Sequence, residues 1–210
     1  QVRWRLGQEL AKQEKLEVNG NDWIVVPVPD TAKPSADAYA HTLGLPVMEG
    51  LVRNRYVGRT FIETKDRMDR IKEKFNVNKS VLKDKKIILV DDSIVRGSTS
   101  QAIVQYLKER GMVKEIHMRV ACPPIRSPCF YGIDMSTIGE LIPNRNSTNE
   151  QIKKASFEDV DEGVVENISK EIGVDSLQYM SLRGLVKAIN LENGKDDLCM
   201  ACITGEYPTE

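Results

Sequence analysis

One stretch near the middle of this chain limits the folds that are open to it. Residues 87–90, Ile-Ile-Leu-Val, form an apolar run without polar alternation, which predicts a strand buried on both faces. The run ends at two adjacent acids, Asp91 and Asp92, and a loop of small and hydroxyl-bearing residues with one glycine follows at 93–99. Apolar residues then return with helical spacing over 101–110. The stretch therefore predicts a strand, an acid pair, a loop and a helix, in that order.

This order of elements suits the binding of an anionic sugar. The loop amides and the positive end of the helix dipole can hold a phosphate group, and carboxylates at the end of a strand can accept hydrogen bonds from sugar hydroxyls. The alternative is an ordinary strand-to-helix turn in which Asp92 or Ser93 caps the helix without any ligand. Two acids are a costly end for a buried strand, because a buried carboxylate needs a partner. No Gly-x-x-x-x-Gly-Lys-Ser/Thr phosphate loop occurs in the chain.

The rest of the chain alternates predicted strands with predicted helices. Apolar runs predict strands at 23–28 and 115–121. Helical spacing of apolar residues predicts helices over 2–14, 35–43, 67–75, 158–172 and 182–189. A chain of 210 residues with this alternation indicates one α/β domain with a doubly wound, mostly parallel sheet. Since ligands of such sheets bind at the carboxyl ends of the strands, Asp30 and Thr31 are expected near the acid pair.

The composition narrows the class of protein and its partners. The formal net charge of −1 gives the chain no overall attraction to nucleic acid or to an anionic membrane, so we expect neither as a partner. No apolar run approaches the roughly 20 residues of a membrane-spanning helix. Four cysteines in a chain of this size do not make the disulfide-rich scaffold of a secreted protein, so we expect a reducing, cytoplasmic location.

Residues 87–100 closely resemble the phosphoribosyl pyrophosphate (PRPP) motif of type I phosphoribosyltransferases. Further segments, in the family's order, resemble the amidophosphoribosyltransferase family in particular. They are VPVPDTAKPSADAYA (26–40), GLVRNRYVGRTFI (50–62), VDDSIVRGSTS (90–100), PPIRSPCFYGIDM (123–135) and CMACITGEYPT (199–209). The resemblance implies a type I phosphoribosyltransferase fold over residues 1–190, with a flexible loop at about 51–66 and a tail with a Cys-x-x-Cys pair at 191–210.

The resemblance also implies a reaction, in which ammonia displaces pyrophosphate from carbon 1 of PRPP and gives 5-phosphoribosylamine. This is the first committed step of de novo purine (IMP) biosynthesis. Magnesium would neutralise the pyrophosphate, and Thr31, Asp91 and Asp92 are the family's metal-associated positions. The implied catalytic residues are Asp91, Asp92 and Arg59. The implied substrate-binding residues are Thr31, Arg53, Arg55, Asp91, Asp92, Ser93, Ile94, Val95, Arg96, Gly97, Ser98 and Thr99.

Each of these roles has an alternative in which the residue binds no substrate. Thr31 can cap the helix that follows it, and the three arginines of the loop can form a solvated basic surface. The side chain of Arg96 can face solvent while only its amide serves the phosphate. His41 and His117 match no catalytic motif of the family, and packing is expected for both.

Three cysteines match family positions. In iron–sulfur members of the family, the positions of Cys129, Cys199 and Cys202 ligate a [4Fe–4S] cluster, and the fourth ligand lies upstream of the segment that this chain covers. The alternatives are reduced thiols without a ligand, Cys122 as a replacement fourth ligand, or a zinc site.

Full-length members of the family begin with a glutaminase domain, which has no counterpart in this chain. We therefore expect a transferase domain, excised or standalone, that uses free ammonia. The resemblance also implies the glutaminase domain and purine nucleotide inhibitors as partners, and assembly as a homo-oligomer. Two other functions stay open. One is a base-salvage phosphoribosyltransferase, for which no separate base-recognition segment is found, and the other is a non-catalytic regulator that senses PRPP.

Overall fold

The computed structural model describes residues 1–56, 67–133, 137–148 and 159–209. Within these residues, a parallel sheet of four strands has the order β1-β4-β5-β6. The strands are β1 (Trp23–Pro27), β4 (Lys86–Asp91), β5 (Glu115–Val120) and β6 (Ser176–Tyr179). β4 lies between β1 and β5, and Leu89 is in register with Val26 on one side and Met118 on the other.

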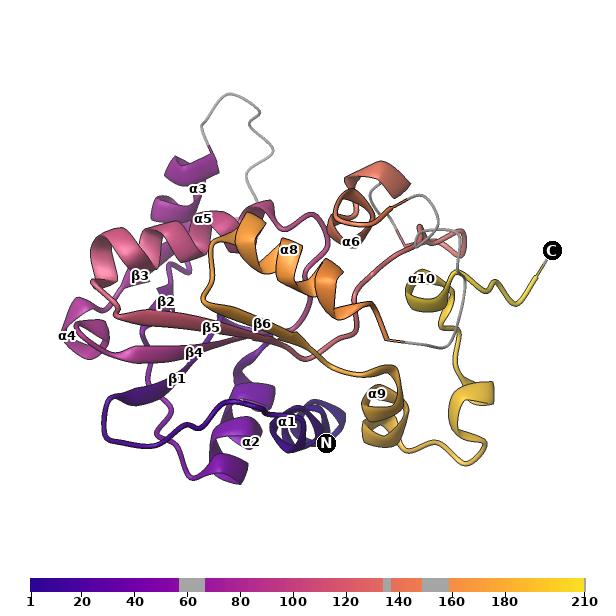
Figure 1. The fold of residues 1–210 in the computed structure, drawn as a ribbon, viewed down its shortest axis with the longest axis horizontal. Coiled ribbons are helices and arrows are strands. Elements are labelled where there is room, and N and C mark those ends of the chain that lie inside the picture. Colours follow the sequence, from indigo (N-terminus) through magenta and orange to yellow (C-terminus); the bar gives the residue numbers. More distant parts are fainter. Residues whose placement is uncertain (57–66, 134–136, 149–158, 210) are drawn as a thin grey trace.

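Helices cover both faces of this sheet (Figure 1). One face carries α5 (Ser98–Tyr106) and α8 (Glu162–Ile172). The other face carries α1 (Val2–Lys12), α2 (Lys33–Leu43) and α9 (Leu182–Ile189). Each of these helices overlaps a segment in which apolar spacing predicted one. The predicted α/β class with a mostly parallel sheet is confirmed.

The core is divided by the sheet, and β4 contributes to both halves. Ile87 and Leu89 pack with residues of α5 and α8, whereas Ile88 and Val90 pack with residues of α1 and α2. All four side chains are fully buried. Successive side chains of a strand point to opposite faces, so a strand covered on both faces needs an apolar residue at every position. This explains why no polar residue interrupts the run.

The N-terminal segment is held against the sheet by close packing and by one buried ion pair. α1 crosses α2 at Gly7, where a Cβ would lie 2.1 Å from the carbonyl oxygen of Ser35. The Ser35 hydroxyl donates to the carbonyl of Arg3 at 2.9 Å. Just after α1, the carboxylate of Glu14 pairs with Arg119 of β5. The helix is therefore fixed to both its neighbour and the sheet.

A small antiparallel sheet lies beside the main one. It consists of β2 (Leu51–Arg53) and β3 (Phe75–Val77). The helix α3 (Arg67–Lys74) precedes β3 in the chain, and α4 (Lys79–Leu82) follows it. β2 pairs with β3, and Leu51 and Phe75 are buried in the main core. The sequence predicted a loop at about 51–66. In the structure this segment begins as the strand β2, because Leu51 packs inward. Residues 57–66 of that predicted loop lie outside the described residues.

The remaining elements are short. They are a π-helix (Leu107–Gly111), a 3₁₀-helix (Ile138–Glu140), α6 (Ile142–Arg145), a second 3₁₀-helix (Gly194–Asp197) and α10 (Ala201–Thr204). The tail docks on the segment after β5, because the amides of Arg126 and Ser127 donate to the carbonyl of Cys202 at 2.9 and 3.0 Å. The Tyr207 hydroxyl donates to the carbonyl of Pro128 at 2.7 Å. Among the described residues, none of the helices has the length and apolar character to span a membrane.

Candidate active site

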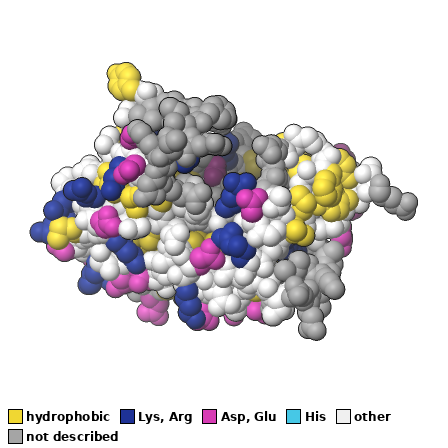
Figure 2. All heavy atoms as spheres, turned by 90° about the horizontal axis from the view of Figure 1, so that it is seen from above, with side chains coloured by type: hydrophobic (Ala, Val, Ile, Leu, Met, Phe, Trp, Pro, Cys, Tyr) yellow, Lys and Arg dark blue, Asp and Glu magenta, His cyan; other side chains and the backbone are white. Residues whose placement is uncertain are grey.

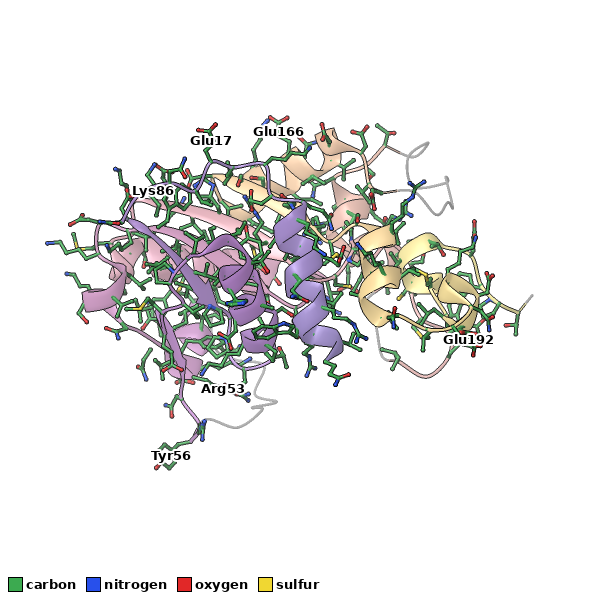
Figure 3. The ribbon with its side chains drawn as sticks, turned by 90° about the horizontal axis from the view of Figure 1, so that it is seen from below. Glu17, Arg53, Tyr56, Lys86, Glu166 and Glu192 are labelled. Carbon is green, nitrogen blue, oxygen red and sulfur yellow. The ribbon has the colours of Figure 1, made fainter. Side chains whose placement is uncertain are left out.

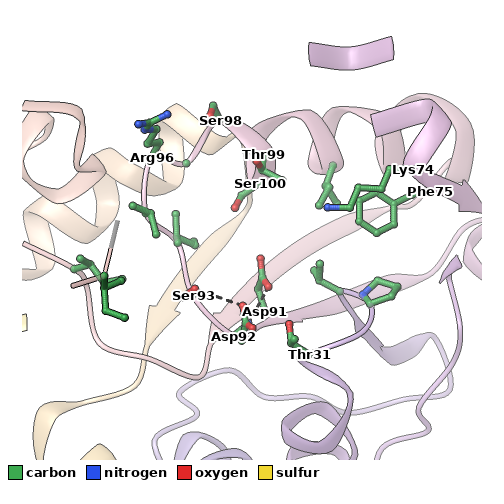
Figure 4. Close-up of a pocket in the computed structure, with 18 residues that line it drawn as sticks. Thr31, Lys74, Phe75, Asp91, Asp92, Ser93, Arg96, Ser98, Thr99 and Ser100 are labelled. Atoms are coloured by element: carbon green, nitrogen blue, oxygen red, sulfur yellow. Dashed lines mark hydrogen bonds between the residues drawn. The ribbon is translucent and has the colours of Figure 1, made fainter. Parts of the chain in front are cut away.

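A cavity of about 680 Å³ lies at the carboxyl ends of β1 and β4 (Figure 4). The loop after β4 and the first turn of α5 line one side, and Lys74 and Phe75 lie on another. Most of the substrate-binding residues expected from the sequence line this cavity. They are Thr31, Asp91, Asp92, Ser93, Ile94, Val95, Arg96, Gly97, Ser98 and Thr99. β1 and β4 are parallel neighbours, so their carboxyl ends share one edge, and the segments that follow both strands meet there.

The acid pair is the electrostatic centre of this cavity. Asp91 is the last residue of β4 and is only 9% exposed. Its Oδ1 accepts a hydrogen bond from the backbone N–H of Asp92 at 2.8 Å. Burial, and then the charge of Asp92, raise the pKa of Asp91 to about 7, and the positive charge of Lys74 opposes this rise. A carboxyl group with such a pKa, in a cavity beside a second carboxyl group, is typical of a functional site.

The loop after the acid pair has a backbone that only glycine accommodates at one position. Gly97 is the N-cap residue of α5 and has a φ of +77°. A Cβ at this position would lie 2.2 Å from Cδ1 of Ile142. The amide of Ile142 donates to the carbonyl of Val95 at 2.9 Å, so α6 supports the loop from the side. Both the dihedral angle and the close approach require the absence of a side chain.

The N-terminus of α5 is arranged to receive an anion. α5 has no side-chain cap among the described residues, so the first amides of the helix are not used by a capping oxygen. Ser98, Thr99 and Ser100 lie at this end of the helix and line the cavity (Figure 4). Free amides and hydroxyl groups at a helix N-terminus favour a phosphate group. The acid pair faces this end of the helix across the cavity.

Arg96 has its guanidinium directed away from the acid pair. Its Nη2 lies 3.4 Å from Oε1 of Glu140, and about half of the side chain is exposed. The carbonyl of Arg96 accepts a hydrogen bond from Nη2 of Arg145 at 2.9 Å. The arrangement therefore fits the alternative in which the backbone of Arg96, and not its guanidinium, contributes to the loop.

Thr31 and the loop arginines have different positions. Thr31 lines the cavity, and α2 begins without a side-chain cap among the described residues, so Thr31 does not serve as one. Nη1 of Arg53 lies 3.0 Å from Oδ2 of Asp30, beside the cavity. Arg53 and Arg55 are not among the residues that line it. Arg59, an expected catalytic residue, lies outside the described residues.

Lys74 and Phe75 are two of the cavity residues that were not expected from the sequence. Lys74 ends α3 and Phe75 begins β3, and both face the cavity opposite the phosphate loop. Nζ of Lys74 lies 5.3 Å from the centre of the Phe75 ring. The sequence carries no local motif at this position, and a lysine at the end of an exposed helix is typical of a solvated surface. Only the packing of α3 and β3 against the main sheet brings it to the site.

The four cysteines are free thiols. Burial raises the pKa of Cys202, as do Cys129 and Cys199, so these three thiols lie in one region near the docked tail. Burial also raises the pKa of Cys122 to about 12, with contributions from Cys202 and Asp92. Among the described residues, no group of three or more histidine, cysteine, aspartate or glutamate side chains is arranged to hold a metal ion. The three thiols by themselves do not make a site for a cluster with four thiolate ligands.

The chain belongs to the phosphoribosyl transferase domain family, whose model matches residues 3–128. Its relatives include the amidophosphoribosyltransferase of Methanocaldococcus jannaschii, which is 46% identical over 211 residues, with 100% of this chain and 39% of the relative covered. The amidophosphoribosyltransferase of Bacillus subtilis is 40% identical, with 100% of this chain and 40% of the relative covered. The chain thus spans about two-fifths of the length of these relatives.

Solved structures give the same result. The chain is similar to the glutamine PRPP amidotransferase from B. subtilis complexed with ADP and GMP, with a TM-score of 0.79 and 39% identity over 100% of this chain and 42% of that one. It is also similar to a structure described as the allosteric regulatory enzyme of purine biosynthesis, with a TM-score of 0.78 and 39% identity over 100% of this chain and 41% of that one. The resemblance to amidophosphoribosyltransferases and the expected type I phosphoribosyltransferase fold are confirmed.

Proposed function

We propose that this chain is the phosphoribosyltransferase part of an amidophosphoribosyltransferase. It would catalyse the attack of ammonia on carbon 1 of PRPP, with loss of pyrophosphate and formation of 5-phosphoribosylamine. The observation that carries the proposal is the acid pair Asp91–Asp92, which faces the N-terminus of α5 across one cavity. The similarity of the whole chain to amidophosphoribosyltransferases supports the choice of this reaction among those of the family.

The cavity suggests how PRPP is held. Its 5′-phosphate would lie at the first turn of α5, where the amides of Ser98 and Thr99 and the helix dipole favour an anion. The ribose hydroxyls would donate to Asp91 and Asp92. The pyrophosphate would then extend toward Thr31 and Lys74, which line the same cavity. This orientation leaves carbon 1 in the cavity between the acid pair and the wall at Lys74.

The proposed reaction is a substitution at carbon 1. The nitrogen of ammonia forms the new bond as the bond from carbon 1 to the pyrophosphate oxygen breaks, and the electron pair leaves with pyrophosphate. Positive charge develops on the ribose ring in the transition state. The carboxylates of Asp91 and Asp92 would stabilise that charge and orient the ring, and Lys74 would stabilise the leaving group. A proton lost from the new amine passes to solvent or to pyrophosphate.

The donor set is compatible with Mg²⁺. Hard carboxylate oxygens of Asp91 and Asp92 and the hydroxyl of Thr31 line one cavity, and Mg²⁺ uses one or two carboxylates together with substrate phosphates. When bound, Mg²⁺ would neutralise charge on the pyrophosphate as it leaves. Asp91, Asp92 and Thr31 are the residues that would hold it.

Further parts of the proposal concern the whole protein. Full-length relatives suggest a glutaminase domain as the source of ammonia and purine nucleotides as inhibitors. The relative solved with ADP and GMP supports the proposal of nucleotide inhibitors. The same relatives suggest a homo-oligomer and a cytoplasmic location. A [4Fe–4S] cluster on Cys129, Cys199 and Cys202 would need a fourth ligand from outside this chain. Iron and sulfide analysis of the full-length protein and of this chain would test that requirement.

The reaction is tested by pyrophosphate release from PRPP with Mg²⁺ and either ammonium or glutamine as nitrogen donor. We expect release with ammonium and none with glutamine alone. Release that depends on adenine or hypoxanthine would instead establish a base-salvage enzyme. Tight PRPP binding without release under any of these conditions would establish a sensor. Release with glutamine alone would contradict the proposed need for a separate glutaminase.

A further inference from the structure

A second cavity, of about 620 Å³, lies away from the acid pair along β6. Its floor is the continuous segment 175–181, which contains the whole of β6. α8 and residues 159–160 form one side, and Gln13 and Lys15, from the connection after α1, contribute to the rim. Figure 1 shows β6 between α8 on one face of the sheet and α1 and α9 on the other. The cavity is therefore a groove along the outer edge of the sheet.

The strand in this groove has one edge that no other described strand pairs with. Within the described residues, β6 pairs with β5 alone. The amide of Met180 donates to the carbonyl of Val120 in β5 at 2.8 Å. Because successive residues of a strand direct their main-chain groups to opposite sides, the main-chain groups of Tyr179 and Leu177 face away from β5. An edge of this kind is a template for one more strand.

Two buried polar atoms of residues at the groove have no hydrogen-bond partner in the part of the chain that the structure describes. Nε2 of Gln178 and the hydroxyl of Tyr179 are buried and make no hydrogen bond with the described residues. Tyr179 as a whole is 8% exposed. Leaving a buried donor unpaired is costly. Both residues line the groove, but the protein itself covers these two atoms, so the free main-chain edge and the charges of the groove remain as its means of binding.

The charged residues that line the groove favour an occupant of positive charge. Four acidic residues line it, and Lys15 is the one cation among the described lining residues. The acids are Asp159, Glu162, Glu166 and Asp175. Lys15 pairs with Glu162 at 2.8 Å, and both side chains are largely exposed. Glu166 lies on the surface of α8 (Figure 3) and pairs with Lys170 of the same helix at 2.7 Å, and these two side chains are also largely exposed. The excess of carboxylates favours a positively charged occupant.

The spacing of two of these acids matches an extended chain. Glu162 and Glu166 are four residues apart on α8 and so share one face of the helix, with an axial separation of about 6 Å. Alternate residues of a strand, which point to the same face, are separated by about 6.6 Å. Two basic side chains at positions i and i+2 of a strand beside β6 can therefore each meet one glutamate. The apolar side chains of Val160, Val165 and Leu177 also line the groove.

We infer that the groove along β6 binds an extended peptide segment with basic residues at alternate positions, which adds to the sheet as a further strand. The main-chain groups of Leu177 and Tyr179 pair with the peptide. Glu162 and Glu166 exchange their exposed partners, Lys15 and Lys170, for its cationic side chains. This interaction surface is separate from the proposed transferase site, and its presence does not depend on that activity.

The test uses a capped synthetic heptapeptide, Lys-Thr-Lys-Val-Lys-Thr-Lys, with a fluorescent label. Two control peptides have glutamate in place of every lysine, or N-methyl groups on the amides that would face β6. We expect saturable binding of the lysine peptide by anisotropy, and slower hydrogen exchange of the amides at 177 and 179. The controls should bind at least tenfold more weakly. Equal binding of the N-methylated peptide would overturn strand addition.

Variants of the chain separate the groove from general attraction between charges. The double variant Glu162→Lys with Glu166→Lys should weaken binding of the lysine peptide at least tenfold. Glu192→Lys, on the exposed turn after α9, is the matched control and should leave binding within about twofold. Equal losses in both variants would overturn the assignment to this groove. If hydrogen exchange of the amides at 177 and 179 becomes slower as the protein concentration rises, in the absence of peptide, the edge binds a second copy of this chain and not a peptide.

Discussion

The guanidinium of Arg119 meets the carboxylate of Glu14 through two hydrogen bonds, from Nε to Oε2 at 2.6 Å and from Nη2 to Oε1 at 2.9 Å. The two side chains are only 2% and 3% exposed. Tyr39 of α2 also donates to Glu14, and Nη1 of Arg119 donates to the hydroxyl of Ser176 at 3.0 Å. One buried ion pair thus joins the segment after α1 to α2, β5 and β6.

Removal of one partner of this pair should be more damaging than removal of both. Glu14→Ala leaves a buried guanidinium without its counter-charge, and we expect a loss of about 3–5 kcal/mol in the free energy of unfolding. The double variant Glu14→Leu with Arg119→Met should lose much less. Urea denaturation measures both. A double variant less stable than either single variant would contradict this account of the pair.

The same pair predicts how stability depends on pH. Burial of Glu14 would raise its pKa, but the hydrogen bonds and charge of Arg119 outweigh burial and lower the pKa to about 2. An acid with a lowered pKa in the folded state stabilises the fold above its unfolded pKa, and this contribution is lost as the pH falls toward the folded value. Between pH 5 and 2 we expect a loss of about 3 kcal/mol. Glu14→Gln should lack this part of the pH dependence; an unchanged slope in the variant would contradict it.

Gly97→Ala should destabilise the fold and weaken phosphate binding together. The substitution places a side chain at positive φ and forces it against Ile142. We expect a loss of about 2–4 kcal/mol. Gly44→Ala is the matched control, since Gly44 has a φ of +69° but open space around it; it should cost about 1 kcal/mol. Thermal unfolding and PRPP titration measure the two effects. Equal costs at both positions would exclude a role for Ile142.

Asp91→Asn with Asp92→Asn should abolish pyrophosphate release while the fold stays intact. Both substitutions keep the shape of the side chain and remove the negative charges that the proposed mechanism needs. Circular dichroism and the unfolding midpoint report on the fold, and the release assay with ammonium reports on turnover. Asp37→Asn, at an exposed position of α2, is the control and should retain full activity. Activity in the double variant would remove the acid pair from the mechanism.

Lys74→Met should raise the KM for PRPP by about tenfold or more. The side chain faces the cavity and interacts with Asp91, so its loss removes positive charge from the expected path of the pyrophosphate. Lys79→Met, at an exposed position of α4, is the control and should leave KM unchanged. An unchanged KM in Lys74→Met would place the pyrophosphate elsewhere.

The accuracy of the sequence analysis followed the strength of the local signals. β4 was predicted well because both faces of the strand are buried, so every residue from 87 to 90 is apolar. β6 was missed because Ser-Leu-Gln-Tyr at an edge is half polar and carries no clear period. β2 and β3 have three residues each, too few for a pattern to emerge. They form because they pair with one another and pack on the core, which local sequence does not record.

The residues of the candidate site were also predicted best where the local sequence signal is strong. The acid pair and the loop to Thr99 are contiguous, and their chemistry is legible in one stretch. Thr31 could be added because parallel strands place their carboxyl ends at one edge. Lys74 could not be predicted from the sequence, because its position depends on how α3 packs. Arg96 shows that a basic residue inside a motif can direct its charge away from the site. The order of a motif predicts where the backbone goes better than where each side chain points.

The contacts of α1 have a consequence for the growing polypeptide. α1 is synthesised before β5 and α9, yet it is anchored by Arg119 of β5 and packs against α9. During translation the apolar cluster that contains Leu6 and Leu10 begins with residues of β1 and α2, and it is complete only after β4 and the segments after β5 and β6 have been made. This interval leaves part of the apolar cluster uncovered, and such a surface favours aggregation or binding by a chaperone of nascent chains. Fast elongation between β1 and α9 would shorten the exposure, and a pause there would raise the yield of aggregate.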